Sequence, residues 1–423
     1  MLSAQRMLHR NTGGALTARI DCLDSSLSYS TIRVIRASRI NFPRKDATLI
    51  IESNTNRNSK TTNTETRHRK FTGKFTPASI KSILLLGSYR MYADRPSELM
   101  VGDAFIRLRG IVPKGVVHLK IEGFTSGGSI KSKTARHMLD QFEARGNAHR
   151  NQRFIESSSG NLGLALSMIA AERGYRFTCV CDPNLSPQTH KLMLAFGARV
   201  VVVTERDQNG GFLGTRIATI RRMLEEDPGL VWLNQYTSAD NAGAHLRFTG
   251  PEVFSAFPRV DFLFVGAGTT GTLGGLSRYA RRHSPHTRII AVDSVGSVTF
   301  GMPSGKRYIS GLGTSCRPPI ADHCEMDALE MIEEADTIVM CRRLAAQGLL
   351  VGGSTGTVLS AVARRAQSMP PDAVIVAISP DLGDRYVDTI YDNGWVEARF
   401  AGLLERCRMT ISDAPLLWER HHG

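Results

Sequence analysis

The sequence lacks long apolar runs, and this absence excludes a membrane-spanning helix. In its 423 residues, stretches such as Val200–Val203 and Val374–Ile378 are far shorter than the roughly 18 residues that a span requires. The seven cysteines are odd in number and include no Cys-x-x-Cys, which argues against a zinc site or a disulfide framework. We therefore expect no metal and a reducing, cytoplasmic location, although the arginine-rich N-terminal segment leaves organelle targeting open.

Apolar residues are also missing from Ser53 to Lys70, a stretch of Asn, Thr, Ser and charged residues. Residues 1–78 hold 14 Lys/Arg against 5 Asp/Glu, so most of the chain's net charge of +14 belongs to this segment. Such a composition cannot bury a core and predicts a disordered basic extension over residues 1–79. It could be a dispensable tail, a targeting sequence or a misplaced start, and nucleic-acid binding remains an alternative only for this segment.

From Ile80 onward, short β-rich runs alternate with helical stretches, a pattern typical of α/β folds with parallel sheets. So many strands favour two sheets over one. We expect a larger domain from residues 80–112 and 241–400, a second domain at 113–240, and a C-terminal tail at 401–423. The expected strands include Phe154–Glu156, Phe177–Cys181, Val200–Val203, Phe262–Val265, Ile289–Asp293, Thr337–Met340 and Val374–Ile378.

Glycine clusters mark four expected strand-to-helix turns, where ligands of parallel sheets bind. They are Gly127–Ser129, Ser159–Gly163, Gly266–Thr272 and Gly352–Thr357. The third follows an apolar strand and opens a helix, so its N–H groups could hold a phosphate. Gly266, Gly268 and Gly271 also fit Gly-x-Gly-x-x-Gly with Asp293 on the next strand, which keeps a nicotinamide-dependent oxidoreductase open as an alternative.

Lys131 follows the first glycine turn and begins a predicted helix. The positive end of the helix dipole disfavours a charged amine there, lowers its pKa and makes it a better nucleophile toward an aldehyde. Lys133 is a second lysine only two residues away. The family resemblance given below selects Lys131, because it alone keeps the register after the glycine pair.

The segment Leu119–Lys131 resembles the cofactor-lysine segment of the cysteine synthase and cystathionine β-synthase family. These are fold type II pyridoxal-phosphate enzymes, similar to the tryptophan synthase β subunit. Glu156–Gly163 is similar to that family's substrate-carboxylate loop and Gly268–Thr272 to its phosphate cup, in the same order along the chain. The resemblance runs from about Val101 to Trp395 and implies two domains, each a mainly parallel twisted sheet flanked by helices, in a homodimer.

Further stretches resemble the branch of this family that begins 2,3-diaminopropionate synthesis. They are Glu156–Met168, Cys179–Pro187, Gly210–Leu213, Thr215–Ile217, Asn234–Tyr236, Thr269–Gly271, Gly296–Val298 and Asp384–Tyr386. Three segments depart from the family pattern: Thr125-Ser126 replaces Asn-Pro, Ser132-Lys133 replaces Asp-Arg, and Asp103-Ala104-Phe105 stands where Asn-Thr-Pro is common.

The resemblance implies a role for each matching residue. Lys131 would carry pyridoxal 5'-phosphate as a Schiff base and act as the catalytic base, Asn161 would bind the ring hydroxyl, and Ser354 the pyridine nitrogen. The phosphate would be held by Gly268, Thr269, Thr270, Gly271 and Thr272. The substrate carboxylate would be bound by Ser158, Ser159, Asn161 and Gln235.

The implied reaction is β-replacement on O-phosphoserine, or another O-activated serine, through an α-aminoacrylate. The expected nucleophile is the amine of glutamate, with Arg216 and Tyr236 helping to hold this second substrate, in diaminopropionate, siderophore or antibiotic biosynthesis. A guanidinium suits a planar carboxylate. A surface position for Arg216 and mere packing for Tyr236 are the simpler alternatives. A cysteine synthase that uses sulfide is the alternative function.

Overall fold

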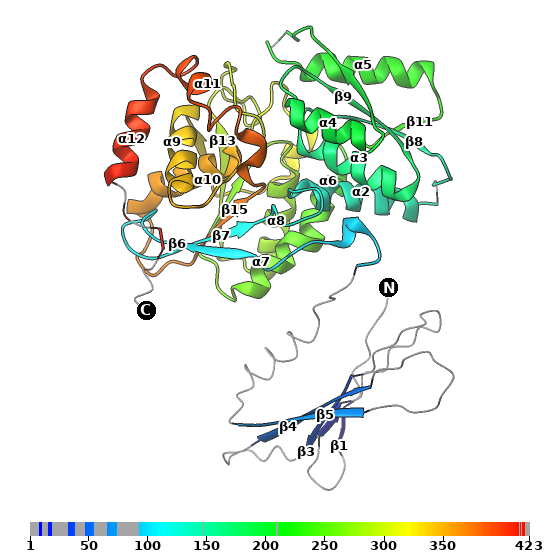
Figure 1. Ribbon diagram of the computed structural model, residues 1–423, viewed down its shortest axis with the longest axis vertical. Coiled ribbons are helices and arrows are strands. Elements are labelled where there is room, and N and C mark those ends of the chain that lie inside the picture. Colours follow the sequence, from blue (N-terminus) through cyan, green and yellow to red (C-terminus); the bar gives the residue numbers. More distant parts are fainter. Residues whose placement is uncertain are drawn as a thin grey trace. The chain divides into compact units, whose positions relative to one another are not determined.

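A computed structural model of the chain describes residues 93–413 except 147 and 209, residues 415, 417 and 418, and five N-terminal strands. The chain divides into two units, Met1–Tyr92 and Ala93–Gly423 (Figure 1). In the first unit an antiparallel sheet has its strands in sequence order: β1 (Leu8–Arg10), β2 (Leu16–Ala18), β3 (Arg33–Ser38), β4 (Ala47–Asn54) and β5 (Thr66–Gly73).

These five strands differ from the disordered extension expected over residues 1–79. The composition of the whole segment conceals short β-favouring runs, such as Leu49, Ile50 and Ile51 within β4. The remaining residues of this segment lie outside the described part of the chain. The interpretations of the segment as a tail, a targeting sequence, a misplaced start or a nucleic-acid-binding region concern those residues as well.

The second unit contains a six-stranded sheet with the strand order β14-β13-β12-β15-β7-β6. Neighbouring strands are parallel except for β6, which is antiparallel to β7 at one edge. The bounds are β6 (Phe105–Leu108), β7 (Val117–Ile121), β12 (Phe262–Gly266), β13 (Arg288–Ser294), β14 (Ala328–Ile332) and β15 (Ile375–Ser379). The inner strands β12 and β15 are mostly apolar and buried, because helices cover both faces of the sheet.

A second, four-stranded sheet is parallel throughout, in the order β10-β9-β8-β11. Its strands are β8 (Arg153–Ser157), β9 (Arg176–Cys181), β10 (Arg199–Val202) and β11 (Leu230–Trp232). The helices α3 (Asn161–Arg173), α4 (Pro187–Ala195) and α5 (Leu213–Glu226) pack against it. Two parallel sheets flanked by helices confirm the predicted fold class.

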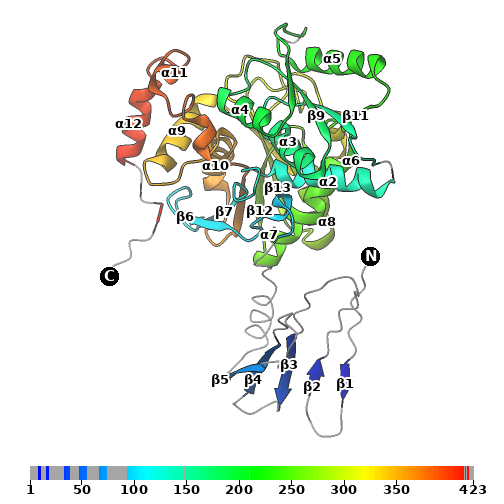
Figure 2. The ribbon, with the colours of Figure 1, turned by 45° about the vertical axis from the view of Figure 1, so that its right-hand side comes forward.

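The remaining helices are α2 (Lys131–Ala144), α6 (Ala239–Ala244), the π-helix His245–Thr249, α7 (Gly250–Ala256), α8 (Gly271–His283), α9 (Glu334–Ala345), α10 (Gly353–Arg365), α11 (Asn393–Glu397) and α12 (Leu403–Asp413). Of these, α2 packs against α3 and α6, whereas α8 and α10 pack on the six-stranded sheet. Figures 1 and 2 both show α9, α10 and α12 gathered beside this sheet, away from α3, α4 and α5. No helix in the described residues is both long and apolar enough for a membrane crossing.

Three sequence-based expectations are corrected here. The boundary at residue 113 assigned β7 to the second domain, but β7 pairs with β15 in the six-stranded sheet. The described start of the expected C-terminal tail is part of the fold, because α12 packs on α9 and buries Leu403 and Cys407. Thr337–Met340 is helical and not a strand, since Ile338, Cys341 and Leu344 recur at helical spacing on the buried face of α9.

Candidate active site

Lys131 lies at the junction between the six-stranded sheet and α2. The turn before it contains Gly128 with φ +67°, and the N–H of Ile130 donates to the carbonyl of Pro380, just past β15, at 2.8 Å. Within the described residues, the Lys131 side chain makes no hydrogen bond or ion pair. Burial lowers its pKa, although the nearby charge of Asp381 acts in the opposite direction. The environment therefore favours the neutral, nucleophilic amine.

Lys133 has the opposite environment. Its Nζ lies 2.7 Å from Glu122 and 2.5 Å from Glu252, and Lys120 pairs with the same two carboxylates. Burial disfavours the charge of Lys133, but Glu122 and Glu252 outweigh this effect and raise its pKa. A lysine held as a cation in ion pairs is a poor nucleophile. This contrast supports the choice of Lys131.

The expected phosphate loop, Gly268–Thr272, connects β12 to the start of α8. Asn241 donates from Nδ2 to Thr269 Oγ1 at 2.9 Å. A Cβ at Gly271 would lie 2.0 Å from Asn241 Oδ1, and one at Gly268 would lie 2.8 Å from a backbone carbonyl, so only glycine fits at both positions. The loop leads directly into the N-terminus of α8, where exposed backbone N–H groups favour the binding of an anion.

Thr270 provides the test of whether a phosphate fits this loop. Its φ of +68° is unusual for a β-branched residue, and its buried Oγ1 has no hydrogen-bond partner among the described residues. A buried hydroxyl without a partner is costly, so a ligand that hydrogen-bonds to it would be favoured here. The phosphate of pyridoxal phosphate would satisfy it and the N–H groups of the loop, so these residues fit the cofactor.

Thr272 contacts a residue that the sequence did not place in this site, His245. Its Oγ1 lies 3.2 Å from His245 Nε2, and the same ring contacts Thr134 and Thr249. Burial lowers the pKa of His245 well below its usual value, with the nearby Lys131 acting in the same direction. His245 is thus a neutral residue that supports the loop through its contacts with Thr272, Thr134 and Thr249.

We predict that Thr270→Gly stabilises the apo-protein but weakens cofactor binding. Glycine relieves about 1–2 kcal/mol of left-handed backbone strain. Loss of a hydrogen bond to a charged phosphate, worth about 1.5–3 kcal/mol, weakens binding about ten- to a hundredfold. Thermal unfolding and titration of the apo-protein with pyridoxal phosphate measure the two effects. Thr270→Val is the matched control: it keeps the strain and lacks the hydroxyl, so it should lose affinity without gaining stability. Wild-type affinity in both variants would exclude the hydroxyl from the phosphate site.

The expected substrate loop runs from the end of β8 into α3. Ser158 Oγ accepts from the N–H of Gly163 at 3.0 Å, and Gln235 Nε2 donates to the carbonyl of Ser157 at 2.7 Å. Both side chains therefore cap backbone groups of this turn, as serine and other short polar residues often do. Glu156 lies beneath the loop, where burial raises the pKa of its carboxyl to about 7 against the opposing hydrogen bonds from backbone and Trp232.

Arg216 reaches the substrate loop from α5. Its side chain is only 12% exposed, and it donates to Ser159 Oγ at 3.3 Å while lying 3.4 Å from the carboxylate of Asp182. The surface alternative for Arg216 is therefore wrong. Tyr236 is 7% exposed, and its hydroxyl lies 3.4 Å from the carbonyl of Ser157. The structure thus brings Arg216, Tyr236 and Ser159 together at one end of the loop.

Asn161, the first residue of α3, contacts two residues that the sequence did not assign. Its Nδ2 donates to Asp381 Oδ2 at 2.7 Å, and its Oδ1 accepts from Arg385. Asp384–Tyr386 was noted only as a likeness, and Asp381 carried no signal of its own. Ser354 is buried in the first turn of α10, where its Oγ faces Gly311.

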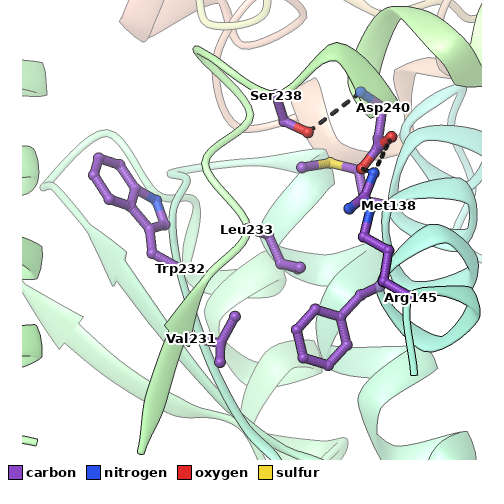
Figure 3. Close-up of a pocket in the computed structure, with 8 residues that line it drawn as sticks. Met138, Arg145, Val231, Trp232, Leu233, Ser238 and Asp240 are labelled. Atoms are coloured by element: carbon purple, nitrogen blue, oxygen red, sulfur yellow. Dashed lines mark hydrogen bonds and ion pairs between the residues drawn. The ribbon is translucent and has the colours of Figure 1, made fainter. Parts of the chain in front are cut away.

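A separate small hollow of about 80 Å³ lies between α2 and the segment after β11 (Figure 3). Arg145 and Asp240 form an ion pair at its edge, 2.8 Å apart. Its walls are Met138, Phe142, Arg145, Val231, Trp232, Leu233, Ser238 and Asp240. None of these belongs to the set predicted to bind the cofactor or substrate, so the hollow is not the candidate site.

Comparison with known proteins identifies the family of the chain. A family model described as pyridoxal-phosphate dependent enzyme matches residues 104–381. The chain is 40% identical over 290 residues to an N-(2-amino-2-carboxyethyl)-L-glutamate synthase of Ralstonia nicotianae, covering 68% of this chain and 86% of that protein.

Two solved structures extend the comparison. An O-ureido-L-serine synthase aligns with a TM-score of 0.66 at 30% identity, covering 71% of this chain and 96% of its own. An O-acetylserine dependent cystathionine β-synthase from Helicobacter pylori aligns with a TM-score of 0.66 at 25% identity, covering 71% and 100%. Asp293, required by the nicotinamide alternative, is fully buried and accepts from the N–H of Ser294. The chain belongs to the pyridoxal-phosphate dependent enzymes of fold type II and is a β-substituting enzyme of the cysteine synthase-like group.

Proposed function

We propose that this enzyme replaces the phosphate group of O-phosphoserine with the amine of glutamate, yielding N-(2-amino-2-carboxyethyl)-L-glutamate and inorganic phosphate. The C–O bond at the β-carbon breaks, and a C–N bond forms in its place. The product in the name of the Ralstonia relative supports this proposal. The same resemblance supports a homodimer and a place in 2,3-diaminopropionate, siderophore or antibiotic biosynthesis.

Bound at Lys131, pyridoxal phosphate supplies an electron sink that eases departure of the β-substituent. The free amine of Lys131, favoured by the partial burial of its side chain, takes the proton from the α-carbon of the first substrate. The turn Ser158–Gly163 offers backbone N–H groups at the N-terminus of α3 to the substrate carboxylate. Ser158 and Gln235 keep this turn in shape through their contacts with its backbone.

One observation carries the choice of nucleophile: Arg216 is mostly buried and contacts Ser159 on the substrate loop. Sulfide needs no cationic anchor, whereas glutamate brings carboxylates that a guanidinium holds well. The hydroxyl of Tyr236 adds a polar group beside the same loop. The test is to incubate the enzyme and O-phosphoserine with either glutamate or sulfide and to identify the products by mass spectrometry. Rapid cysteine formation with no use of glutamate would establish the cysteine synthase alternative instead.

We predict that Arg216→Ala raises the KM for glutamate about ten- to a hundredfold, because a charged hydrogen bond worth about 1.5–3 kcal/mol is lost. Steady-state kinetics at saturating O-phosphoserine measures this change. Release of phosphate from O-phosphoserine alone should change little, since Arg216 acts on the second substrate. Arg216→Lys is the control that keeps the charge but lacks the planar fork, and an intermediate KM is expected. Unchanged glutamate kinetics in both variants would remove Arg216 from the site.

A further inference from the structure

The amide of Asn161 lies between two oppositely charged side chains. Asp381 accepts from its nitrogen at 2.7 Å, and Arg385 donates to its oxygen. Asn161 begins α3, which packs on the four-stranded sheet, whereas Asp381 and Arg385 both follow β15 of the six-stranded sheet. The segment after β15 therefore provides a hydrogen-bond partner for each end of the Asn161 amide, which lies at the start of α3 beside the four-stranded sheet.

This arrangement allows only one orientation of the amide. A carboxylate can only accept hydrogen bonds and a guanidinium can only donate them. If the amide of Asn161 were flipped, its oxygen would face Asp381 and its nitrogen would face Arg385. Both charge-assisted hydrogen bonds would be lost. The partners themselves therefore define which end of Asn161 carries the N–H groups.

The two charged residues are themselves held in place. The hydroxyl of Tyr386 donates to Asp381 Oδ2 at 2.8 Å, and burial, together with Asp381, raises the pKa of Tyr386 well above its usual value. Tyr386 thus stays protonated as a donor. Arg385 also donates to the carbonyl of Gly127 at 2.9 Å. A Cβ at Gly128 would lie 2.4 Å from the same guanidinium, so this glycine leaves room for it.

Asp381, Arg385 and Tyr386 lie close to Lys131. Asp381 forms a β-bridge with Ser129, and its charge acts on the pKa of Lys131. Its second oxygen, Oδ1, is buried without a hydrogen-bond partner among the described residues. A Cβ at Gly352 would lie 2.0 Å from this oxygen, so the first turn of α10 also approaches the carboxylate closely.

We propose that Asp381 and Arg385 are positioning residues that fix the amide of Asn161, so that its nitrogen faces the ring hydroxyl of the cofactor. An amide nitrogen carries two N–H groups. One of them goes to Asp381, and the other is left for the ring oxygen. The inference rests on the roles of Lys131 and Asn161 toward the cofactor and is independent of the second substrate.

The first test is Asp381→Asn. A neutral amide at 381 can present either its oxygen or its nitrogen, so it no longer dictates the orientation of Asn161. We expect about tenfold weaker binding of pyridoxal phosphate to the apo-protein and an altered absorption spectrum of the bound cofactor, because a hydrogen bond to the ring oxygen affects its electronic state. Asp384→Asn is the matched control: it is the same chemical change on the same segment at an exposed side chain, and it should alter neither quantity.

The exchange Asn161→Asp with Asp381→Asn separates positioning from general stability. Asp at 161 accepts from Arg385 and from the amide at 381, so the contact between the segments and the melting temperature are recovered. The donor to the ring is still missing, and we expect the altered spectrum to persist.

Wild-type spectrum and affinity in Asp381→Asn, or recovery of both in the exchange variant, would overturn the proposal. If Asp381→Asn does not fold, Arg385→Lys answers the same question with the charge kept. A spectral change supports positioning, and an unchanged spectrum contradicts it.

Discussion

Replacing Lys131 with alanine is expected to lower turnover by about 10³-fold or more while leaving the fold intact. In the proposed function, Lys131 both bonds the cofactor and moves the α-proton, so the variant would lose both groups. Its removal breaks no ion pair or hydrogen bond within the described residues. Steady-state kinetics measures the loss of turnover, and thermal unfolding of the apo-protein should give a melting temperature close to that of the wild type.

Borohydride reduction of the wild-type holoenzyme, followed by peptide mapping, identifies the attachment site directly. A reduced cofactor on the peptide at Lys131 would agree with the lowered pKa of this lysine. A cofactor attached to Lys133 would show that the ion pairs with Glu122 and Glu252 are absent in the holoenzyme, and the assignment would have to be reversed.

Lys133→Met is expected to destabilise the protein by about 3–5 kcal/mol, the usual cost of removing one partner from a buried ion pair. Glu122 is fully buried, and Lys120 alone would then have to neutralise two carboxylates. Urea unfolding of the apo-protein measures the change. Lys191→Met, at an exposed side chain on α4, is the control and should stay within about 0.5 kcal/mol of the wild type.

The effect of Lys133→Met on chemistry should be small if the protein is assayed well below its lowered melting temperature. Unchanged stability of the variant would mean that the ion pairs of Lys133 with Glu122 and Glu252 contribute no net free energy to folding. Loss of the covalent cofactor in a folded Lys133→Met protein would instead show that Lys133 is needed for cofactor attachment.

Several parts of the site could be predicted from the sequence because they are local. The glycine turns before Lys131 and Thr272 can be recognised from their clustered glycines, and each turn lies between a strand and a helix. The environment of Lys133 could not be predicted, since it depends on Glu252 from a distant helix. The contacts of Asn161 with Asp381 and Arg385 join residues more than two hundred positions apart, and no periodicity signals such a pair.

Sheet membership was the other limit. The apolar pattern of β7 identifies a strand, but nothing local says that its partner is β15 and not β8. Likewise, Thr337–Met340 reads as a short β-rich run, and the burial of Ile338 and Leu344 on one helical face becomes evident only with the surrounding core.

The pairing of β7 with β15 also constrains the order of events during synthesis. Val117 pairs with Ile375, and Pro380 receives the N–H of Ile130 directly before the cofactor lysine. On the ribosome, β7 therefore emerges long before its partner, whereas the four-stranded sheet spans Arg153–Trp232 and can assemble early. Such non-local pairing slows folding. The nascent chain can hold Lys131 in its final place only after β15 has left the ribosome, so with the proposed role of Lys131 the cofactor would be bound late in synthesis.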